Sequence, residues 1–232
     1  MADLAGPTPA GDDVLDRWRS ALPAAADPTR APQMAAYMQD RFAFFGIVAD
    51  ERRRRQRAAL DGVGPLDEHD LLAAARGAWA LPEREYQYAA CDLLRSRVGT
   101  LTPAALPTLR WLVTTRSWWD TVDALAAHVV GGVIHRHRGA QVLMDDWIGA
   151  EDLWLARTAL LHQLTWKADT DADRLFAYCV ARAADRAFFV RKAIGWALRQ
   201  HARTDPEAVW AFVDAHVDEL SPLSVREATR HR

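Results

Sequence analysis

The chain has 232 residues and a mass of 25.9 kDa, which suits one large domain or two small ones with a sizeable core. Its 29 basic and 31 acidic side chains give a formal charge of −2, so the totals give no sign of a polyanionic partner. Half of the residues are hydrophobic, but the mean hydropathy is −0.20 and no long uncharged apolar run occurs, so we expect a soluble globular protein with no membrane span.

The first 13 residues are rich in Ala, Gly and Pro and carry acidic side chains, with no basic cluster before an apolar run. This pattern predicts a short disordered tail rather than a signal peptide, followed by a single domain over residues 14–232. Cys91 and Cys179 both lie in Ala-rich stretches that favour helix, which is typical of buried, reduced thiols. We therefore expect a cytoplasmic protein, in the bacterial cytoplasm.

Helices are predicted along the whole chain, because Ala and Leu are abundant and no stretch alternates as a strand does. Residues 52–60 and 66–79 should form a helical pair across the turn at 62–65. Prolines and capping side chains mark later helix starts at Pro82, Thr102-Pro103, Ser117 and Asp205-Pro206. The fold class predicted from these signals is all-α.

Aromatic side chains recur at a spacing of 35 residues, at Trp119, Trp154 and Phe189. Small and aliphatic residues follow each of them at matching positions. Stacked two-helix repeats need such a recurrence to bury a continuous core. We therefore predict a curved superhelix of degenerate two-helix repeats, with any chemistry on its concave face.

Six segments carry motifs in a fixed order: MAAYMQDRFAFFGI at 34–47, LPEREYQYAACDLL at 81–94, SWWDTVDAL at 117–125, WLARTALLHQL at 154–164, FFVRKAIGWALRQHARTDPEAVWAFV at 188–213 and LSPLSVREA at 220–228. Together they resemble the AlkD-type DNA alkylation repair proteins, from about residue 32 to the C-terminus. The resemblance implies a right-handed α-superhelix of HEAT-like repeats with a concave DNA-binding face. It also implies excision of N3- and N7-alkylated purines from duplex DNA, by a monofunctional glycosylase that does not flip the base into a pocket.

The resemblance also assigns roles to individual side chains. Asp123 matches the family's catalytic carboxylate, with Trp119 and Trp196 as the two tryptophans of the cleft. Arg157 and Arg199 match basic residues that the family directs at DNA phosphates, and Tyr37 matches a tyrosine near the lesion end of the DNA-binding cleft. Where the family has a Thr-Pro after the segment at 34–47, this chain has Val48-Ala49-Asp50.

Two basic stretches lie between acidic ones, so the net charge of the whole chain does not describe its local charge. Residues 51–58 sum to +4 and residues 181–203 to +5. We expect both stretches to contact DNA phosphates, through Arg52 and Arg53 in the first and through Arg191, Lys192 and Arg199 in the second. The net charge therefore excludes a protein that is basic over its whole surface, but it permits a local basic surface that binds DNA.

The expected chemistry needs few groups, because a cationic alkylpurine is already a good leaving group. A carboxylate has only to stabilise the oxocarbenium-like sugar or orient the attacking water. Trp119 and Asp123 are four residues apart, so on one helix they share a face, and the indole can hold the cationic nucleotide beside the acid. No Gly-rich phosphate loop, nucleophile elbow or metal-ligand spacing is present, so we expect no cofactor and no metal.

For each residue assigned a catalytic or DNA-binding role, an ordinary structural role is the alternative. An Asp on a helix is most often a solvated carboxylate, a run of arginines most often a solvated helix face, and Trp119 or Trp196 a core residue. Trp118 and Trp119 are adjacent, so only one of them can face the core. His135 and His137 are expected in a solvated turn after Gly131-Gly132.

Two other functions stay open at this point. A non-catalytic relative would use the same basic face to bind branched or damaged DNA, and a helical scaffold would bind another protein. We expect a monomer acting on duplex DNA that contains alkylated purines, with no membrane partner.

Overall fold

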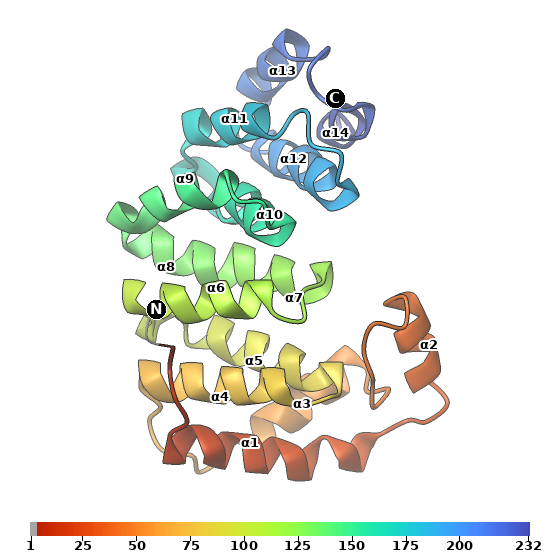
Figure 1. The fold of residues 1–232 in the computed structure, drawn as a ribbon, viewed down its shortest axis with the longest axis vertical. Coiled ribbons are helices and arrows are strands. Elements are labelled where there is room, and N and C mark those ends of the chain that lie inside the picture. The colour runs from red at the N-terminus through yellow and green to blue at the C-terminus, as the bar shows by residue number, and fades with distance from the viewer. Residues whose placement is uncertain (1–3) are drawn as a thin grey trace. The chain divides into compact units, whose positions relative to one another are not determined.

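The computed structural model describes residues 4–232, which fold into helices joined by turns (Figure 1). Within this range there is no β-strand, only an isolated bridge between Ala43 and Glu83. The predicted all-α class is confirmed. No helix in the same range is long and apolar enough to cross a membrane.

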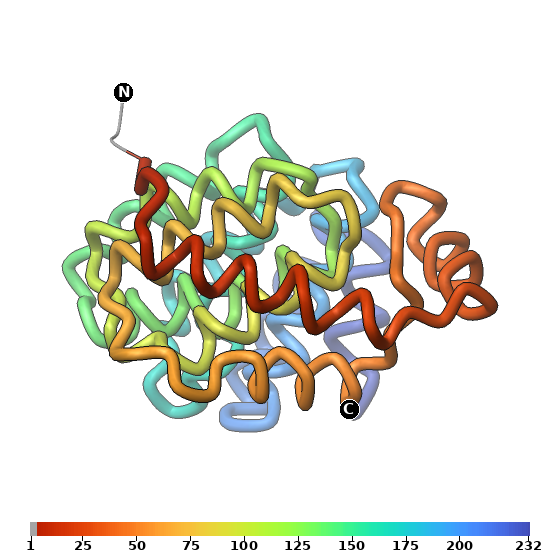
Figure 2. Tube along the Cα trace, turned by 90° about the horizontal axis from the view of Figure 1, so that it is seen from below, coloured from red at the N-terminus to blue at the C-terminus, as the bar shows by residue number. Residues whose placement is uncertain are grey.

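The contacts divide the chain into two compact units, one ending at Arg116 and one beginning at Ser117. The single domain over residues 14–232 stays a prediction. Each unit is described by itself. The first contains α1 (Pro9–Ala21), α2 (Ala31–Tyr37), α3 (Ala49–Ala58), α4 (Glu68–Ala80), α5 (Arg84–Ser96) and α6 (Leu106–Thr114). In it α1 packs against α4, and α4 against α5 (Figures 1 and 2). The two helices predicted over residues 52–60 and 66–79 are confirmed as α3 and α4, and α3 packs on α5.

The first helix begins earlier than the sequence predicted. Thr8 caps α1 by accepting a hydrogen bond from the backbone N–H of Gly11 at 2.9 Å, and Pro9 occupies the first helical position. Val14 and Trp18 are fully buried, and the Trp18 indole donates to the Gln56 carbonyl of α3 at 3.3 Å. The tail predicted over residues 1–13 is therefore wrong for residues 9–13, because the cap and the buried face stabilise a helix there; residues 1–3 lie outside the described range.

A loop after α2 is held by a buried carboxylate on α5. Glu85 is fully buried and accepts the backbone N–H groups of Phe45, Gly46 and Ile47 at 2.9 to 3.1 Å. Gly46 has φ +89°, and a Cβ there would collide with the carbonyl oxygen of Asp27. The loop that returns the chain from α2 therefore requires both the acid and the glycine.

The second unit contains α7 (Trp119–Ala124), a π-helical segment (Leu125–Val130), α8 (Gly131–Arg136), α9 (Val142–Ile148), α10 (Leu153–Leu161), α11 (Ala172–Ala181), α12 (Phe188–His201), α13 (Pro206–Ala215) and α14 (Pro222–Ala228). In it α10 packs on α9 and α12, and α12 on α14 (Figure 1). The helix start predicted at Asp205-Pro206 is confirmed, since the Asp205 side chain accepts from the Ala208 N–H at 3.0 Å.

The segment from Trp119 to Arg136 is helical throughout, with the π-helical turns in its middle. The turn predicted after Gly131-Gly132 is therefore wrong. A Cβ at Gly131 would collide with the carbonyl oxygen of His162, so the glycine lets the end of α10 approach rather than breaking the helix. Widened π turns are frequent at functional sites, and this one begins two residues after Asp123.

An aromatic cluster fills the space between α10 and the starts of α7 and α12. The rings of Trp118, Trp154 and Phe189 lie 4.8 to 5.8 Å apart by their centroids. Trp118 is buried and Trp119 is half-buried, so the prediction that only one of this pair faces the core is confirmed. The residue of the pair that joins this cluster is Trp118, not the Trp119 of the 35-residue series.

Candidate functional site: a carboxylate clamped by arginine

The Asp123 carboxylate of α7 is held by the Arg157 guanidinium of α10. Arg157 Nε lies 2.7 Å from Asp123 Oδ1, and Arg157 Nη2 lies 2.8 Å from Asp123 Oδ2. The third nitrogen, Arg157 Nη1, donates to the backbone carbonyl of Phe189. A planar guanidinium that bonds both carboxylate oxygens fixes the carboxylate in position and in orientation.

The pair is buried unequally. The side chain of Arg157 is 4% exposed, whereas that of Asp123 is 16% exposed and so keeps some contact with the surface. Burial raises the pKa of the Asp123 carboxyl above its ordinary value, and the Arg157 guanidinium opposes that shift. Each carboxylate oxygen has a lone pair that the arginine does not use, so the exposed edge can still stabilise a cation or accept a proton from water.

The location of Arg157 corrects the sequence prediction that this residue contacts a DNA phosphate. Its guanidinium is buried between Asp123 and the Phe189 carbonyl, so it does not form a surface cation. One signal in the sequence was available. Arg157 is the single charged residue in the otherwise apolar helix LWLARTALL, and buried arginines are normally paired with acids.

Trp119 lies one helical turn before Asp123 on α7. Both side chains are half-buried, and their spacing places them on the same side of the helix, as the sequence predicted. An indole on the same side of the helix as the carboxylate offers a flat apolar surface.

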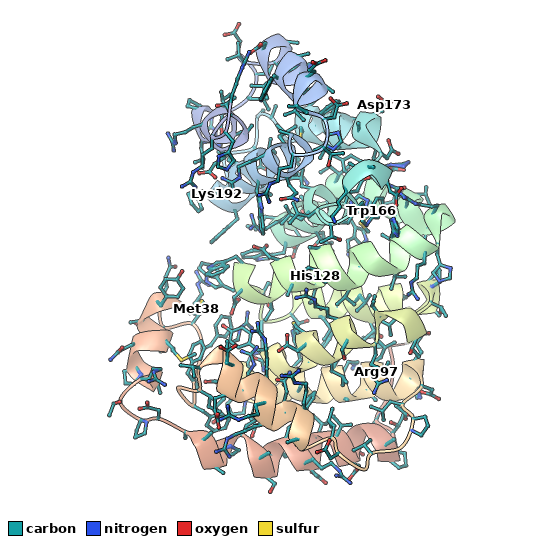
Figure 3. All side chains as sticks on the ribbon, turned by 180° about the vertical axis from the view of Figure 1, so that it is seen from behind. Met38, Arg97, His128, Trp166, Asp173 and Lys192 are labelled. Carbon is teal, nitrogen blue, oxygen red and sulfur yellow. The ribbon has the colours of Figure 1, made fainter. Side chains whose placement is uncertain are left out.

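A second group of predicted residues lies along one side of α12. Lys192, Trp196 and Arg199 are spaced by four and three residues, so they follow one face of the helix. Lys192 is labelled in Figure 3. Glu227 on α14 pairs with both cations: Lys192 Nζ lies 2.6 Å from Oε1, and Arg199 Nη1 lies 2.8 Å from Oε2. The side chains of Lys192 and Arg199 are 37% and 21% exposed, so both remain accessible.

Glu227 was not predicted, although its segment, LSPLSVREA, was noted in the sequence. Its side chain is 11% exposed, and the hydrogen bonds and charges of Lys192 and Arg199 hold its pKa below the ordinary value. A Cβ at Gly195 would collide with the Glu227 side chain and lie 2.7 Å from the Ser224 carbonyl oxygen. The missing side chain at Gly195 therefore lets α14 come close enough to α12 for the acid to reach both cations.

The third basic residue predicted on α12 is Arg191. Its Nε donates to the backbone carbonyl of Asp185 at 2.6 Å, so this guanidinium ties the start of α12 to the preceding turn. The Ser224 hydroxyl donates to the carbonyl of Arg191 at 2.9 Å, which adds a further link between α12 and α14. Arg191 is half-buried by these contacts.

The remaining predicted DNA contacts lie in the first unit. Tyr37 is the last residue of α2 and is 72% exposed. Arg52 is 6% exposed, with Nη2 2.9 Å from Asp92 Oδ2 and its guanidinium 4.8 Å from the Tyr88 ring centroid, so the phosphate contact predicted for it is not supported. The side chain of Arg53 is 49% exposed and stays accessible to a phosphate.

Residues 4–232 contain no group of three or more His, Cys, Asp and Glu side chains arranged to hold a metal ion. Cys91 and Cys179 are both buried, as predicted, and burial raises the pKa of the Cys179 thiol.

Comparison with known proteins gives a family and a fold. Residues 18–231 match the model of the family described as DNA alkylation repair enzyme. A solved structure described as a predicted DNA alkylation repair enzyme from Enterococcus faecalis superposes with a TM-score of 0.82 at 32% identity, over 89% of this chain and 96% of that one. The structure of smu.31 from Streptococcus mutans UA159 has a TM-score of 0.59 at 17% identity, over 78% and 92%, and shows the fold alone. None of the curated proteins matches the chain.

Proposed function

Because the chain belongs to the family of DNA alkylation repair enzymes, we propose that it is a monofunctional DNA glycosylase. It hydrolyses the N-glycosidic bond of cationic N3- and N7-alkylated purines in duplex DNA, with 3-methyladenine and 7-methylguanine as its simplest substrates, and leaves an abasic site. It needs no metal or cofactor and acts as a monomer in the bacterial cytoplasm.

The observation that carries this proposal is the clamped carboxylate of Asp123. Alkylation at N3 or N7 places a positive charge on the base, so the base departs as a neutral molecule without a general acid. The protein therefore has to place a negative charge near the sugar, where the oxocarbenium-like cation develops. A carboxylate that is already oriented meets this demand without reorganising as the bond breaks.

Arg157 acts in this scheme as a positioning residue. Its two hydrogen bonds fix the plane of the Asp123 carboxylate, and its bond to the Phe189 carbonyl ties that plane to the start of α12. Its charge lowers the electrostatic benefit of the acid but opposes the rise in the Asp123 pKa that burial causes. The exposed edge of the carboxylate then faces the sugar or orients the attacking water.

The face of α12 that carries Lys192, Trp196 and Arg199 binds the DNA backbone in this scheme. Lys192 and Arg199 flank Trp196, and Glu227 limits the rotamers that these two long side chains sample. Phosphates then meet cations that are already oriented, while the half-buried indole contacts the sugar or the backbone.

The test is release of 7-methylguanine and 3-methyladenine from methylated duplex DNA under single-turnover conditions. Asp123→Asn keeps the shape of the side chain and removes its charge, and we expect it to lose base release by about a hundredfold or more. Asp173→Asn, an exposed acid at the start of α11, is the matched control and should release base at the wild-type rate. Wild-type protein that binds the DNA and releases neither base contradicts the proposal.

A second function is favoured by one observation, namely that Arg157 bonds both oxygens of Asp123. A fully neutralised acid suits a protein that binds damaged or branched DNA without cutting it. In that case Asp123→Asn would leave DNA affinity unchanged, and no base would be released by any variant.

A further inference from the structure

A cavity of about 250 Å³ opens on the first unit between α1, α3 and α5, and none of its lining residues is assigned to base release. Its apolar wall consists of Trp18, Leu60, Ala89 and Leu93. Its polar wall consists of Arg53, Gln56, Arg57, Asp92, Arg95 and Ser96. The cavity therefore combines an apolar side with a polar, mainly basic one, which is the usual make-up of a small-molecule site.

The arginine run at 52–57 divides between different partners. Arg54 and Arg55 pair with Glu51 of the same helix, and Arg52 is buried against Asp92. Arg53 and Arg57 are one helical turn apart and line the cavity together. The run is therefore not one uniform solvated face, because two of its members point their charge at a defined space.

The cations of the cavity exceed its acids. Asp92 is its single carboxylate, and this group already accepts from Arg52 Nη2 at 2.9 Å and Gln56 Nε2 at 3.0 Å. Arg57 Nε donates to the Arg53 carbonyl at 3.0 Å, and within residues 4–232 no acid pairs with Arg57 or Arg95. Arg53 is paired at long range with two acids, through Nη1 at 3.5 Å from Asp50 Oδ1 and through Nε at 3.7 Å from Asp92 Oδ2. Three guanidinium groups that share this little negative charge attract an anion carrying more than one charge.

We propose that this cavity binds a nucleoside monophosphate, with the phosphomonoester on Arg53, Arg57 and Arg95 and the ring system on the apolar wall. Arginine forks match the oxygens of a phosphate in pairs, and a phosphomonoester carries close to two negative charges at neutral pH. A flat ring replaces water along Leu60 and Leu93. A bare phosphate would leave that wall exposed, so we expect it to bind more weakly.

The ligand has two possible sources with the same chemistry. One is a free nucleotide, and the other is the 5′-phosphorylated end of a DNA strand. The inference does not rest on the proposed function, because nucleotide binding is measured without base release. Base release is measured separately on the same variants, so a failure of the nucleotide-binding proposal does not contradict the glycosylase proposal, and the reverse also holds.

The experiment is calorimetric titration of the full chain with adenosine 5′-monophosphate, adenosine and inorganic phosphate. We expect the nucleotide to bind most tightly, and Arg57→Gln or Arg95→Gln to weaken it by roughly tenfold to a hundredfold. Both residues are exposed, so these variants should fold; a circular dichroism melt checks that they do. Arg54→Gln, which removes the same charge from the same helix outside the cavity, is the matched control and should bind like wild type.

A second arm compares duplexes that carry a 5′-phosphate or a 5′-hydroxyl on a short overhang. Tighter binding of the phosphorylated end that Arg95→Gln abolishes identifies a strand end as the source, whereas equal binding of the two ends identifies the free nucleotide. The proposal is overturned if neither the nucleotide nor the 5′-phosphate binds, or if Arg54→Gln weakens binding as much as Arg57→Gln does.

Discussion

Asp123 and Arg157 face each other from α7 and α10, 34 residues apart in sequence, through two parallel hydrogen bonds of 2.7 and 2.8 Å. This relationship makes the carboxylate a fixed group and the arginine its support. It also separates two roles that a sequence cannot distinguish, namely a cation that binds a DNA phosphate and a cation that orients a carboxylate of the same protein. The two roles lead to different kinetic results.

Arg157→Lys tests whether Arg157 orients the Asp123 carboxylate or binds a DNA phosphate. A lysine keeps the positive charge but forms no bidentate pair, so the Asp123 carboxylate should lose its fixed plane. We expect the single-turnover rate of base release to fall by about tenfold to a hundredfold, while DNA affinity stays within about twofold of wild type. Rates from quenched reactions and affinities from anisotropy give the two numbers.

The opposite pattern would show that Arg157 holds a phosphate. Affinity would then fall, the rate at saturating protein would be unchanged, and the dependence of affinity on salt would weaken by about one counterion. Melting curves of the variant establish that any loss of rate is not loss of fold.

Glu227→Gln tests the acid that orients the two cations of α12, through its pH dependence. Because Lys192 and Arg199 lower the pKa of Glu227, its contribution to stability is present above the ordinary carboxyl pKa of 4.5 and is lost as pH falls through the lowered value. We expect the variant to be less stable than wild type by about 1–2 kcal/mol at pH 7, with the difference shrinking below pH 4.5.

Urea denaturation at several pH values measures this difference. Glu219→Gln removes an acid paired with His216 at the surface and should change stability by less than about 0.5 kcal/mol. The same variants show what Glu227 does for DNA. An orienting acid predicts weaker binding of DNA by Glu227→Gln, whereas an acid that merely competes with phosphates predicts tighter binding.

Gly195→Ala tests the close approach of α14 to α12. The new methyl group would collide with the Glu227 side chain and press on the Ser224 carbonyl, so α14 must move. Although alanine favours helix by about 1 kcal/mol, we expect a net loss of about 1–3 kcal/mol from overpacking. Chemical denaturation measures it, and Gly139→Ala, whose Cβ would meet no atom within 4 Å, is the control. A Gly195→Ala variant more stable than wild type would contradict the packing argument.

The sequence predicted the helices well because their signals are local. Thr102 accepts from the Ala104 N–H and Asp205 caps α13, as the residue types at those positions indicate. The predicted end of the tail at residue 13 was wrong although the same kind of local signal was present. Thr8 and Pro9 are a helix cap and a first-turn proline, but they lie in a segment whose composition favours disorder.

The partners of the charged residues could not be predicted, because they come from other helices. Nothing near Arg157 in the chain identifies Asp123 as its partner, and nothing near Lys192 identifies Glu227. The helical spacing of Arg53 and Arg57 was visible, but the apolar wall opposite them comes from α1 and α5. Gly131 was misread because a glycine that ends a helix and one that admits a neighbouring carbonyl have the same sequence signature.

Trp118 and Trp119 test whether adjacent tryptophans divide between core and site. Trp118 packs on Trp154 and Phe189, so Trp118→Ala should cost about 3–5 kcal/mol of stability. Trp119 is half-buried and lies one helical turn before Asp123, so Trp119→Ala should cost less stability but slow base release by about tenfold or more. The comparison is made at a temperature where both variants are folded, with thermal melts for stability and single-turnover kinetics for activity. If Trp118→Ala, once folded, lost base release while Trp119→Ala kept it, the indole that serves the site would be the buried one and the assignment of Trp119 would fail.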